Sequence, residues 1–233
     1  MNTSPAHPDS PARRISVYID PACPWTWVTA QWLREAAPRR NLGLRWRPLS
    51  LRLRDGDRPP PGAPAEIQAL AVAARIQSRR LLRIFEALRA ATRDGDIDRL
   101  YRRRGERVFA PPWPRAAPGL GVTGEVVTAA GLPASWAAGA DDPSWDPAIA
   151  AAMTAAAAVC GPEPASPAIV LDGPPAAGLT GPVFTCAPAG PAALRTWDAV
   201  HTLRTEPGFT GLRRPRTSPA PVLSSHPPPA ERA

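Results

Sequence analysis

The chain has 233 residues, of which 28 are arginine and none is lysine, and its formal net charge is +8. This length predicts one domain, or one domain that carries a large insertion. No apolar run approaches the roughly 18 residues that a membrane span needs, and the first residues lack the apolar stretch of a signal peptide. We therefore expect a cytoplasmic protein that does not bind membranes. Three widely spaced cysteines do not form the disulfide framework of a small secreted protein.

Two arginine-rich stretches, residues 79–83 and 101–107, leave two interpretations open. The first is that they form solvated helix faces in a protein whose Ala, Pro, Gly and Arg content reflects GC-rich coding. The second is a surface that binds polyanions. No helix-turn-helix, zinc-finger or RNA-binding signature accompanies these stretches, so we expect no nucleic-acid partner.

The first fifty residues follow a strand, helix, strand pattern. Residues 15–20 alternate between apolar and polar side chains, which is typical of a strand. Residues 24–36 carry apolar side chains at helical spacing, and Pro24 suits the first helical position. Residues 42–51 alternate again. This order predicts a right-handed βαβ unit with parallel strands.

Residues 54–64 have the Pro- and Gly-rich composition of a linker. They separate this unit from a long segment with a helical pattern. Ser144 is the expected N-cap and Gly161 the expected C-cap of the last helix in this segment, which contains no convincing strand. The expected helices cover residues 65–95, 97–109, 125–140 and 144–161, with a Pro-rich loop at 110–121.

Strand patterns return near the end of the chain. Residues 166–173 and 181–188 are short apolar runs with a Gly/Pro turn between them, which predicts a hairpin. Residues 191–204 then form an amphipathic closing helix. The fold class is therefore α/β, with one sheet domain that is split by an all-helical insertion.

Cys23 lies between the first expected strand and the first expected helix. The reactive form of cysteine is the thiolate, and the unpaired N–H groups and dipole at the start of a helix favour it, so we expect a lowered thiol pKa. Thr26, about one turn along, brings a hydroxyl within reach of the sulfur. The alternative is a small buried cysteine with no chemical task. We expect Cys160, near a helix end, and Cys186, in a strand, to serve in packing.

A lone nucleophile of this kind can attack a disulfide or an electrophile. Because Thr26 stands where a second cysteine would make a redox pair with Cys23, an external thiol would have to resolve the mixed disulfide.

The motif Asp-Pro-x-Cys-Pro-Trp-x-Trp at residues 20–27 resembles the actinobacterial branch of the DsbA-type thiol oxidoreductases, in particular the mycothiol-dependent nitroreductases. The resemblance covers roughly residues 15–205. It implies a thioredoxin-like fold split by a helical insertion, and it implies that Pro167 is a cis-proline beside the nucleophile. Further segments that carry it are 48–51, 98–109, 166–173 and 181–199.

This resemblance gives a division of the chain into domains. The thioredoxin-like domain combines residues 15–60 with residues 162–208, and the helical insertion domain covers residues 61–161. From composition alone, we expect residues 1–14 to form a disordered tail and residues 209–233 to form a Pro/Arg-rich tail, because both ends lack apolar periodicity.

Three positions depart from the family pattern. Thr26 replaces the second cysteine of the common Cys-Pro-Trp-Cys site. Asp55 stands where the family often has asparagine, and Phe109 stands where a histidine is expected. These changes argue against ordinary dithiol cycling, but they leave the nucleophile in place.

The leading hypothesis is a thiol oxidoreductase or thiol transferase in which Cys23 attacks and a low-molecular-weight thiol completes the cycle. The resemblance implies mycothiol as that co-substrate, and we expect no metal and no tightly bound cofactor. The partners would be a small thiol and a disulfide or electrophile, with the oligomeric state left open. The catalytic residues would be Cys23 and Thr26, and the substrate-binding residues Pro24, Trp25, Trp27, Ser166 and Pro167.

Two other functions stay open. In the first, the Thr26 hydroxyl activates a bound thiol for conjugation. The kappa-class glutathione transferases, which share this architecture, use a hydroxyl near the helix start in this way. In the second, the chain is a non-catalytic thioredoxin-fold protein that binds partners through its helical insertion or its arginine faces.

Overall fold

The computed structural model of the chain describes residues 13–58, 65–109, 124–172, 177–212 and 214–215. Its elements, in chain order, are β1 (Arg13–Ile19), α1 (Pro24–Ala36), the 3₁₀ helix η1 (Pro38–Arg40), β2 (Leu42–Pro48), α2 (Leu51–Asp55), α3 (Ala65–Ala90), α4 (Asp94–Phe109), α5 (Gly124–Ala129), the 3₁₀ helices η3 (Ala134–Asp141) and η4 (Pro143–Trp145), α6 (Asp146–Cys160), β3 (Ala168–Leu171), β4 (Ala177–Thr180) and α7 (Gly190–Thr205).

The described strands form one sheet with the order β2-β1-β3-β4. β1 and β2 are parallel, from Arg13 opposite Leu42 to Ile19 opposite Pro48. β3 runs antiparallel to both β1 and β4. The predicted parallel βαβ unit and the α/β class are therefore confirmed.

Helices cover both faces of the sheet. Ile15, Val17 and Ile19 of β1 lie in the same core cluster as Trp32 of α1 and Trp197 of α7. The alternate residues of the sheet pack against α6 in a second, smaller cluster formed by Tyr18, Leu49, Ala156, Ala168 and Val170. Because successive residues of a strand point to opposite faces, β1 contributes Ile15, Val17 and Ile19 to one cluster and Tyr18 to the other.

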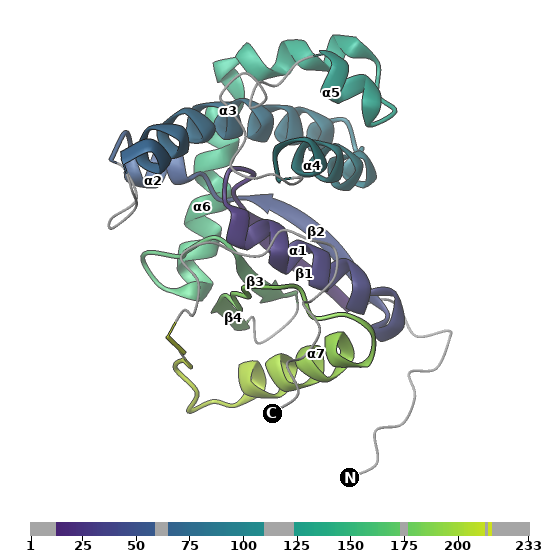
Figure 1. Cartoon of the computed structure of the whole chain (residues 1–233), viewed down its shortest axis with the longest axis vertical. Helices are drawn as coiled ribbons and strands as arrows, with labels where there is room; N and C mark the ends of the chain where they lie inside the picture. Colours follow the sequence, from purple (N-terminus) through teal and green to yellow (C-terminus); the bar gives the residue numbers. More distant parts are fainter. Residues whose placement is uncertain (1–12, 59–64, 110–123, 173–176, 213, 216–233) are drawn as a thin grey trace.

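α3, α4 and α5 gather at one end of the molecule, away from α7 (Figure 1). η3 packs along α3, and α4 contacts both α3 and α5. Within residues 65–109 and 124–160 the structure contains no strand, as the sequence predicted. α6, however, also contacts β2, β3 and β4, so this last helix of the segment covers the sheet. None of the described helices is both long and apolar enough to cross a bilayer.

The predicted hairpin exists, but its second strand was misplaced. β4 covers Ala177–Thr180, which the sequence analysis took as part of the turn, and residues 181–188 form no strand. The strand ends at the cis Gly181–Pro182 bond. Pro182 has no N–H to give to a sheet, and its carbonyl oxygen instead accepts a hydrogen bond from the Thr29 hydroxyl at 2.9 Å.

Other expected boundaries also differ from the structure. Residues 51–55 form the short helix α2 where the second strand was expected to end. Trp145, and not the predicted Ser144, is the N-cap of α6. Ser144 lies inside η4, where its N–H donates to the side chain of the N-cap Asp142. Gly161 is the C-cap of α6, as predicted. Residues 13 and 14 belong to β1, and residues 1–12 of the expected tail lie outside the described residues.

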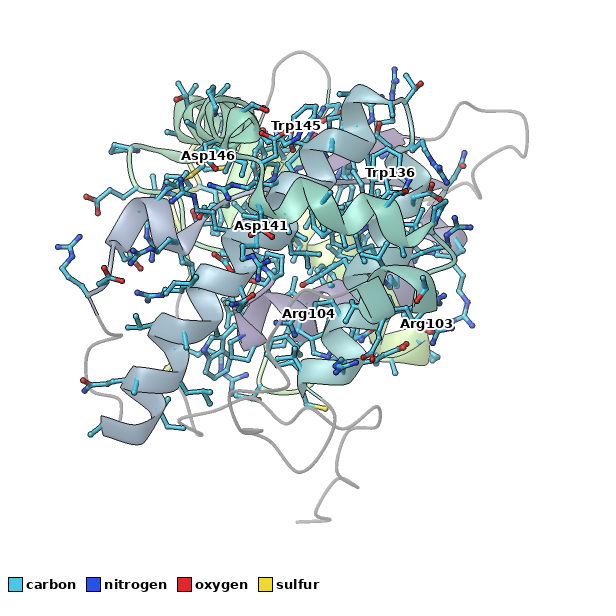
Figure 2. All side chains as sticks on the ribbon, turned by 90° about the horizontal axis from the view of Figure 1, so that it is seen from above. Arg103, Arg104, Trp136, Asp141, Trp145 and Asp146 are labelled. Atoms are coloured by element: carbon cyan, nitrogen blue, oxygen red, sulfur yellow. The ribbon has the colours of Figure 1, made fainter. Side chains whose placement is uncertain are left out.

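The arginine face of α3 is paired with carboxylates of the same chain. Arg79 and Arg83 both contact Asp146 at the start of α6, and Arg80 contacts Asp141 of η3. Figure 2 looks onto this end of the molecule and labels Asp141 and Asp146 together with Arg103 and Arg104 of α4. The contacts of the 79–83 stretch therefore favour internal ion pairing over a polyanion-binding surface.

Candidate active site around Cys23

Cys23 is the N-cap of α1, with extended backbone angles, and Pro24 follows at the first helical position. A short turn delivers the cysteine there from the end of β1. In this turn the Cys23 N–H donates to the Asp20 carbonyl oxygen at 2.9 Å, and the Ala22 N–H donates to Asp20 Oδ1 at 2.7 Å. Asp-Pro is a sequence typical of such a turn, because aspartate bonds the backbone two residues on.

The loop before β3 forms the other side of the site. The Ser166–Pro167 peptide bond is cis, as the family resemblance implied. The Ser166 carbonyl oxygen lies 3.5 Å from Cys23 Sγ and accepts a hydrogen bond from the thiol. The Ser166 hydroxyl lies 2.7 Å from the Thr26 hydroxyl. The structure thus brings together two pairs of residues that are about 140 positions apart in the chain. The first pair is Cys23 and Thr26, and the second is Ser166 and Pro167.

The Cys23 sulfur is largely enclosed by its neighbours. The residue is only 7% exposed, and this burial raises the pKa of the thiol above its ordinary value. The Asp20 carboxylate adds to the increase, while the Thr26 hydroxyl and the backbone N–H groups of Thr26 and Trp25 lower the pKa. The prediction of a lowered pKa was therefore wrong: the helix start favours the thiolate as expected, although it makes no cap hydrogen bond with the sulfur, and desolvation outweighs it.

Asp20 is a member of the site to which the sequence analysis gave no role. Its carboxylate is completely buried and accepts from three elements: the Ala22 N–H before the cysteine, the Leu51 N–H of α2 at 2.6 Å, and the Ser78 hydroxyl of α3 at 2.5 Å. Burial raises the pKa of Asp20, and these hydrogen bonds oppose the increase. Asp20 therefore ties the loop before Cys23 to the helical part of the chain. The Asp-Pro pair at the end of a strand was the available signal for it.

The two tryptophans beside the cysteine have different surroundings. Trp25 is half-buried. Trp27, which the hypothesis assigned to substrate binding, is only 5% exposed and packs against Tyr101 and Phe109, with ring centroids 5.7 and 5.8 Å away. Trp27 also lies directly against the backbone of Gly105 in α4. It therefore supports the start of α1 from the core instead of facing solvent.

Two of the three positions that depart from the family pattern have clear roles in packing or pairing. Phe109 fills the core beside Trp27. Asp55 ends α2 and pairs with Arg54 and Arg75, which lowers the pKa of its carboxyl. Arg54 also donates to the Pro164 carbonyl oxygen at 3.3 Å, and its charge interacts with Cys23. Arg54 is thus electrostatically coupled to the thiol.

The remaining cysteines lie elsewhere, and all three thiols are free. Cys160 ends α6, and its sulfur lies against the backbone of Gly178 in β4. Cys186 is half-buried in the loop after β4, and not in a strand as predicted. Burial raises the pKa of both thiols. Among the described residues, no group of His, Cys, Asp or Glu side chains could hold a metal ion.

Two solved structures share this fold. The crystal structure of the probable DsbA oxidoreductase SCO1869 from Streptomyces coelicolor matches with a TM-score of 0.52 at 19% identity, over 88% of this chain and 94% of the other. A candidate protein disulfide isomerase from Nitrosomonas europaea matches with a TM-score of 0.50 at 13% identity, over 83% and 99% of the two chains. A sheet of this topology with a cysteine at the start of α1 and a cis-proline opposite defines a DsbA-like, thioredoxin-fold protein.

The family is narrower than the fold. The family model described as Rv2466c-like, mycothiol-dependent nitroreductase Rv2466c, matches residues 22–214. The chain therefore belongs to this oxidoreductase family. It is also 29% identical to Rv2286c of Mycobacterium tuberculosis (strain H37Rv), a protein described as uncharacterized, over 89% of this chain and 84% of that relative.

Proposed function

We propose that this protein is a cytoplasmic oxidoreductase that works with a single nucleophilic cysteine and an external low-molecular-weight thiol, with mycothiol as the co-substrate. One observation carries this proposal. Cys23 Sγ lies at the start of α1, 3.5 Å from the carbonyl oxygen of the cis Ser166–Pro167 bond, and Thr26 occupies the place of a second cysteine. The family to which the chain belongs supports a thiol co-substrate.

In the first step, the Cys23 sulfur attacks one sulfur of a disulfide RSSR′. The bond from Cys23 to R–S forms, the S–S bond of the substrate breaks, and R′ leaves as the thiol, which takes up the proton that Cys23 loses. In the second step, an external thiol attacks the sulfur of R in the mixed disulfide. Cys23 leaves as the thiol, and the substrate disulfide and the external thiol have exchanged partners with no net change in electrons.

The raised pKa of the Cys23 thiol limits the fraction of reactive thiolate in this scheme. At neutral pH most of Cys23 is protonated, so attack proceeds through a minor thiolate population. A thiolate of higher pKa is intrinsically more nucleophilic, which offsets part of its scarcity. We therefore expect a slow enzyme at pH 7 whose rate rises with pH.

Intact-mass spectrometry tests the proposal directly. Incubation with mycothiol disulfide should add one mycothiol mass per chain. The Cys23→Ser variant should form no adduct, whereas Cys160→Ser and Cys186→Ser should form it at the wild-type rate, because neither sulfur belongs to the site. Retention of the adduct in Cys23→Ser would refute the proposal.

A second function is favoured by the burial of the Cys23 sulfur. A cysteine that stays protonated could donate its hydrogen, together with the Thr26 hydroxyl, to the thiolate of a bound substrate thiol. The protein would then conjugate thiols to electrophiles without a covalent intermediate on Cys23. In a conjugation assay, Thr26→Val would then reduce turnover more than Cys23→Ala, whereas the single-cysteine oxidoreductase requires the opposite ranking.

A further inference from the structure

Ser166 takes part in the site with two different groups. Its carbonyl oxygen faces the Cys23 sulfur at 3.5 Å. Its hydroxyl oxygen accepts the Asp20 N–H at 2.7 Å and lies 2.7 Å from Thr26 Oγ1. The Thr26 hydroxyl, in turn, acts on the Cys23 thiol and lowers its pKa. A row of polar groups therefore runs from the end of β1 through the hydrogen-bonded hydroxyl groups of Ser166 and Thr26 toward the thiol.

The number of hydrogens fixes the direction of this row when Cys23 is ionised. The Asp20 N–H can only donate, so it occupies an acceptor site of Ser166 Oγ. A thiolate can only accept, so Thr26 must give its single hydroxyl hydrogen to the sulfur. Thr26 Oγ1 then has no hydrogen left for Ser166, and the 2.7 Å contact between the hydroxyl groups can form only with Ser166 as the donor.

We propose that Ser166 is a positioning residue whose hydroxyl donates to Thr26 and thereby directs the Thr26 hydroxyl hydrogen at the Cys23 sulfur. This inference rests on the proposed function in that it takes Cys23 as the nucleophile. It adds a role for the Ser166 side chain that is separate from the role of its backbone in the cis-proline loop.

The two groups of Ser166 act in opposite directions on the thiol. The carbonyl oxygen accepts the S–H hydrogen bond and therefore favours the protonated thiol. The hydroxyl row favours the thiolate. The other charged or titratable groups that act on the sulfur are Asp20, Arg54 and the buried Tyr101. Ser166→Ala also removes the acceptor of the Asp20 N–H, and adding it to Thr26→Val, as described below, measures that effect separately.

The test is the pH profile of Cys23 alkylation by iodoacetamide, measured in a Cys160→Ser, Cys186→Ser background so that only one thiol reacts. Ser166→Ala should raise the apparent thiol pKa by about one unit, which lowers the alkylation rate about tenfold at any pH below that pKa. Ser166→Thr keeps the hydroxyl and should restore the profile. Ser16→Ala is the matched control. It also removes the hydroxyl of a buried serine, but that hydroxyl donates to Asp172 at 2.9 Å and has no contact with Cys23 or Thr26 among the described hydrogen bonds.

Two further results decide the direction of the row. Thr26→Val should raise the thiol pKa, and adding Ser166→Ala to it should change nothing more, because no hydroxyl is left to direct. If Thr26 instead donates to Ser166, Ser166→Ala will release that hydrogen for the sulfur and the pKa will fall. A fall or an unchanged profile overturns the inference. Alkylation needs no mycothiol, so failure of adduct formation would remove the proposed function without deciding this question.

Discussion

The contact between Gly105 and Trp27 gives the sharpest test of how the core supports the site. A Cβ atom at position 105 would lie 2.1, 2.3 and 2.5 Å from three carbons of the Trp27 indole ring, whereas carbon atoms in contact lie about 3.5–4.0 Å apart. Trp27 cannot move freely, since it is 5% exposed and held by Tyr101 and Phe109. Gly105→Ala must therefore displace the indole or α4 by more than an ångström.

The expected cost follows from two opposing effects. Overpacking of a well-filled core costs about 1–3 kcal/mol. Replacing glycine by alanine inside a helix returns about 0.5–1 kcal/mol. We therefore expect Gly105→Ala to lose up to about 2.5 kcal/mol of unfolding free energy. For a protein of this size, each kcal/mol corresponds to a fall in Tm of about 2–4 °C.

Gly95 provides the matched control, because it also lies in α4 and a Cβ there would meet no atom within 4 Å. Gly95→Ala should leave Tm unchanged or raise it. The measurements are thermal unfolding, near-ultraviolet circular dichroism and the alkylation rate of Cys23. Because Trp27 follows Thr26 in α1, Gly105→Ala should also change that rate. If both alanine variants stabilise the protein equally, the proposed packing of Trp27 against α4 is incorrect.

Three further outcomes are expected. The raised pKa of Cys23 predicts that its alkylation rate increases with pH to a midpoint above about 8.5, the value of an unperturbed thiol, and a midpoint below 7 in the Cys160→Ser, Cys186→Ser background would contradict this. Gly178→Ala would place a Cβ 2.5 Å from Cys160 Sγ, so Cys160→Ala should recover part of its lost stability in a double-mutant cycle, and strictly additive losses would exclude the contact. Two arginines lower the pKa of Asp146, so its stabilisation is fully present above the unfolded pKa of about 3.9 and declines as the pH falls from there through the lower pKa of the folded state. Asp146→Asn should therefore lower Tm most at pH 7 and progressively less at about pH 3 and pH 2, and an equal loss at all three pH values would contradict this.

The sequence was most informative where local patterns decide the structure. The alternation in β1, the helical spacing after Pro24 and the spacing to β2 predicted the parallel βαβ unit. The family resemblance supplied the cis-proline at Pro167, which no local pattern distinguishes from the other prolines of the chain. Both kinds of information place Cys23 at the start of α1.

The errors arose where long-range contacts decide. β4 has the residues Ala-Gly-Leu-Thr, which carry no strand pattern, and it forms because β3 offers it an edge. The thiol pKa depends on how deeply neighbouring elements bury Cys23, and the helix start alone could not show this. Asp20 stood in the recognised motif, but its partners Leu51 and Ser78 come from α2 and α3, far along the chain.

The central claim is that one thiol forms the intermediate and an external thiol resolves it. The most direct measurement is the lifetime of the mixed disulfide on Cys23, followed by intact mass after excess reagent has been removed. The adduct should persist until thiol is added and should then disappear at a rate proportional to the thiol concentration. Release at a rate independent of added thiol, with a disulfide between Cys23 and Cys160 or Cys186 found by peptide mapping, would contradict the account.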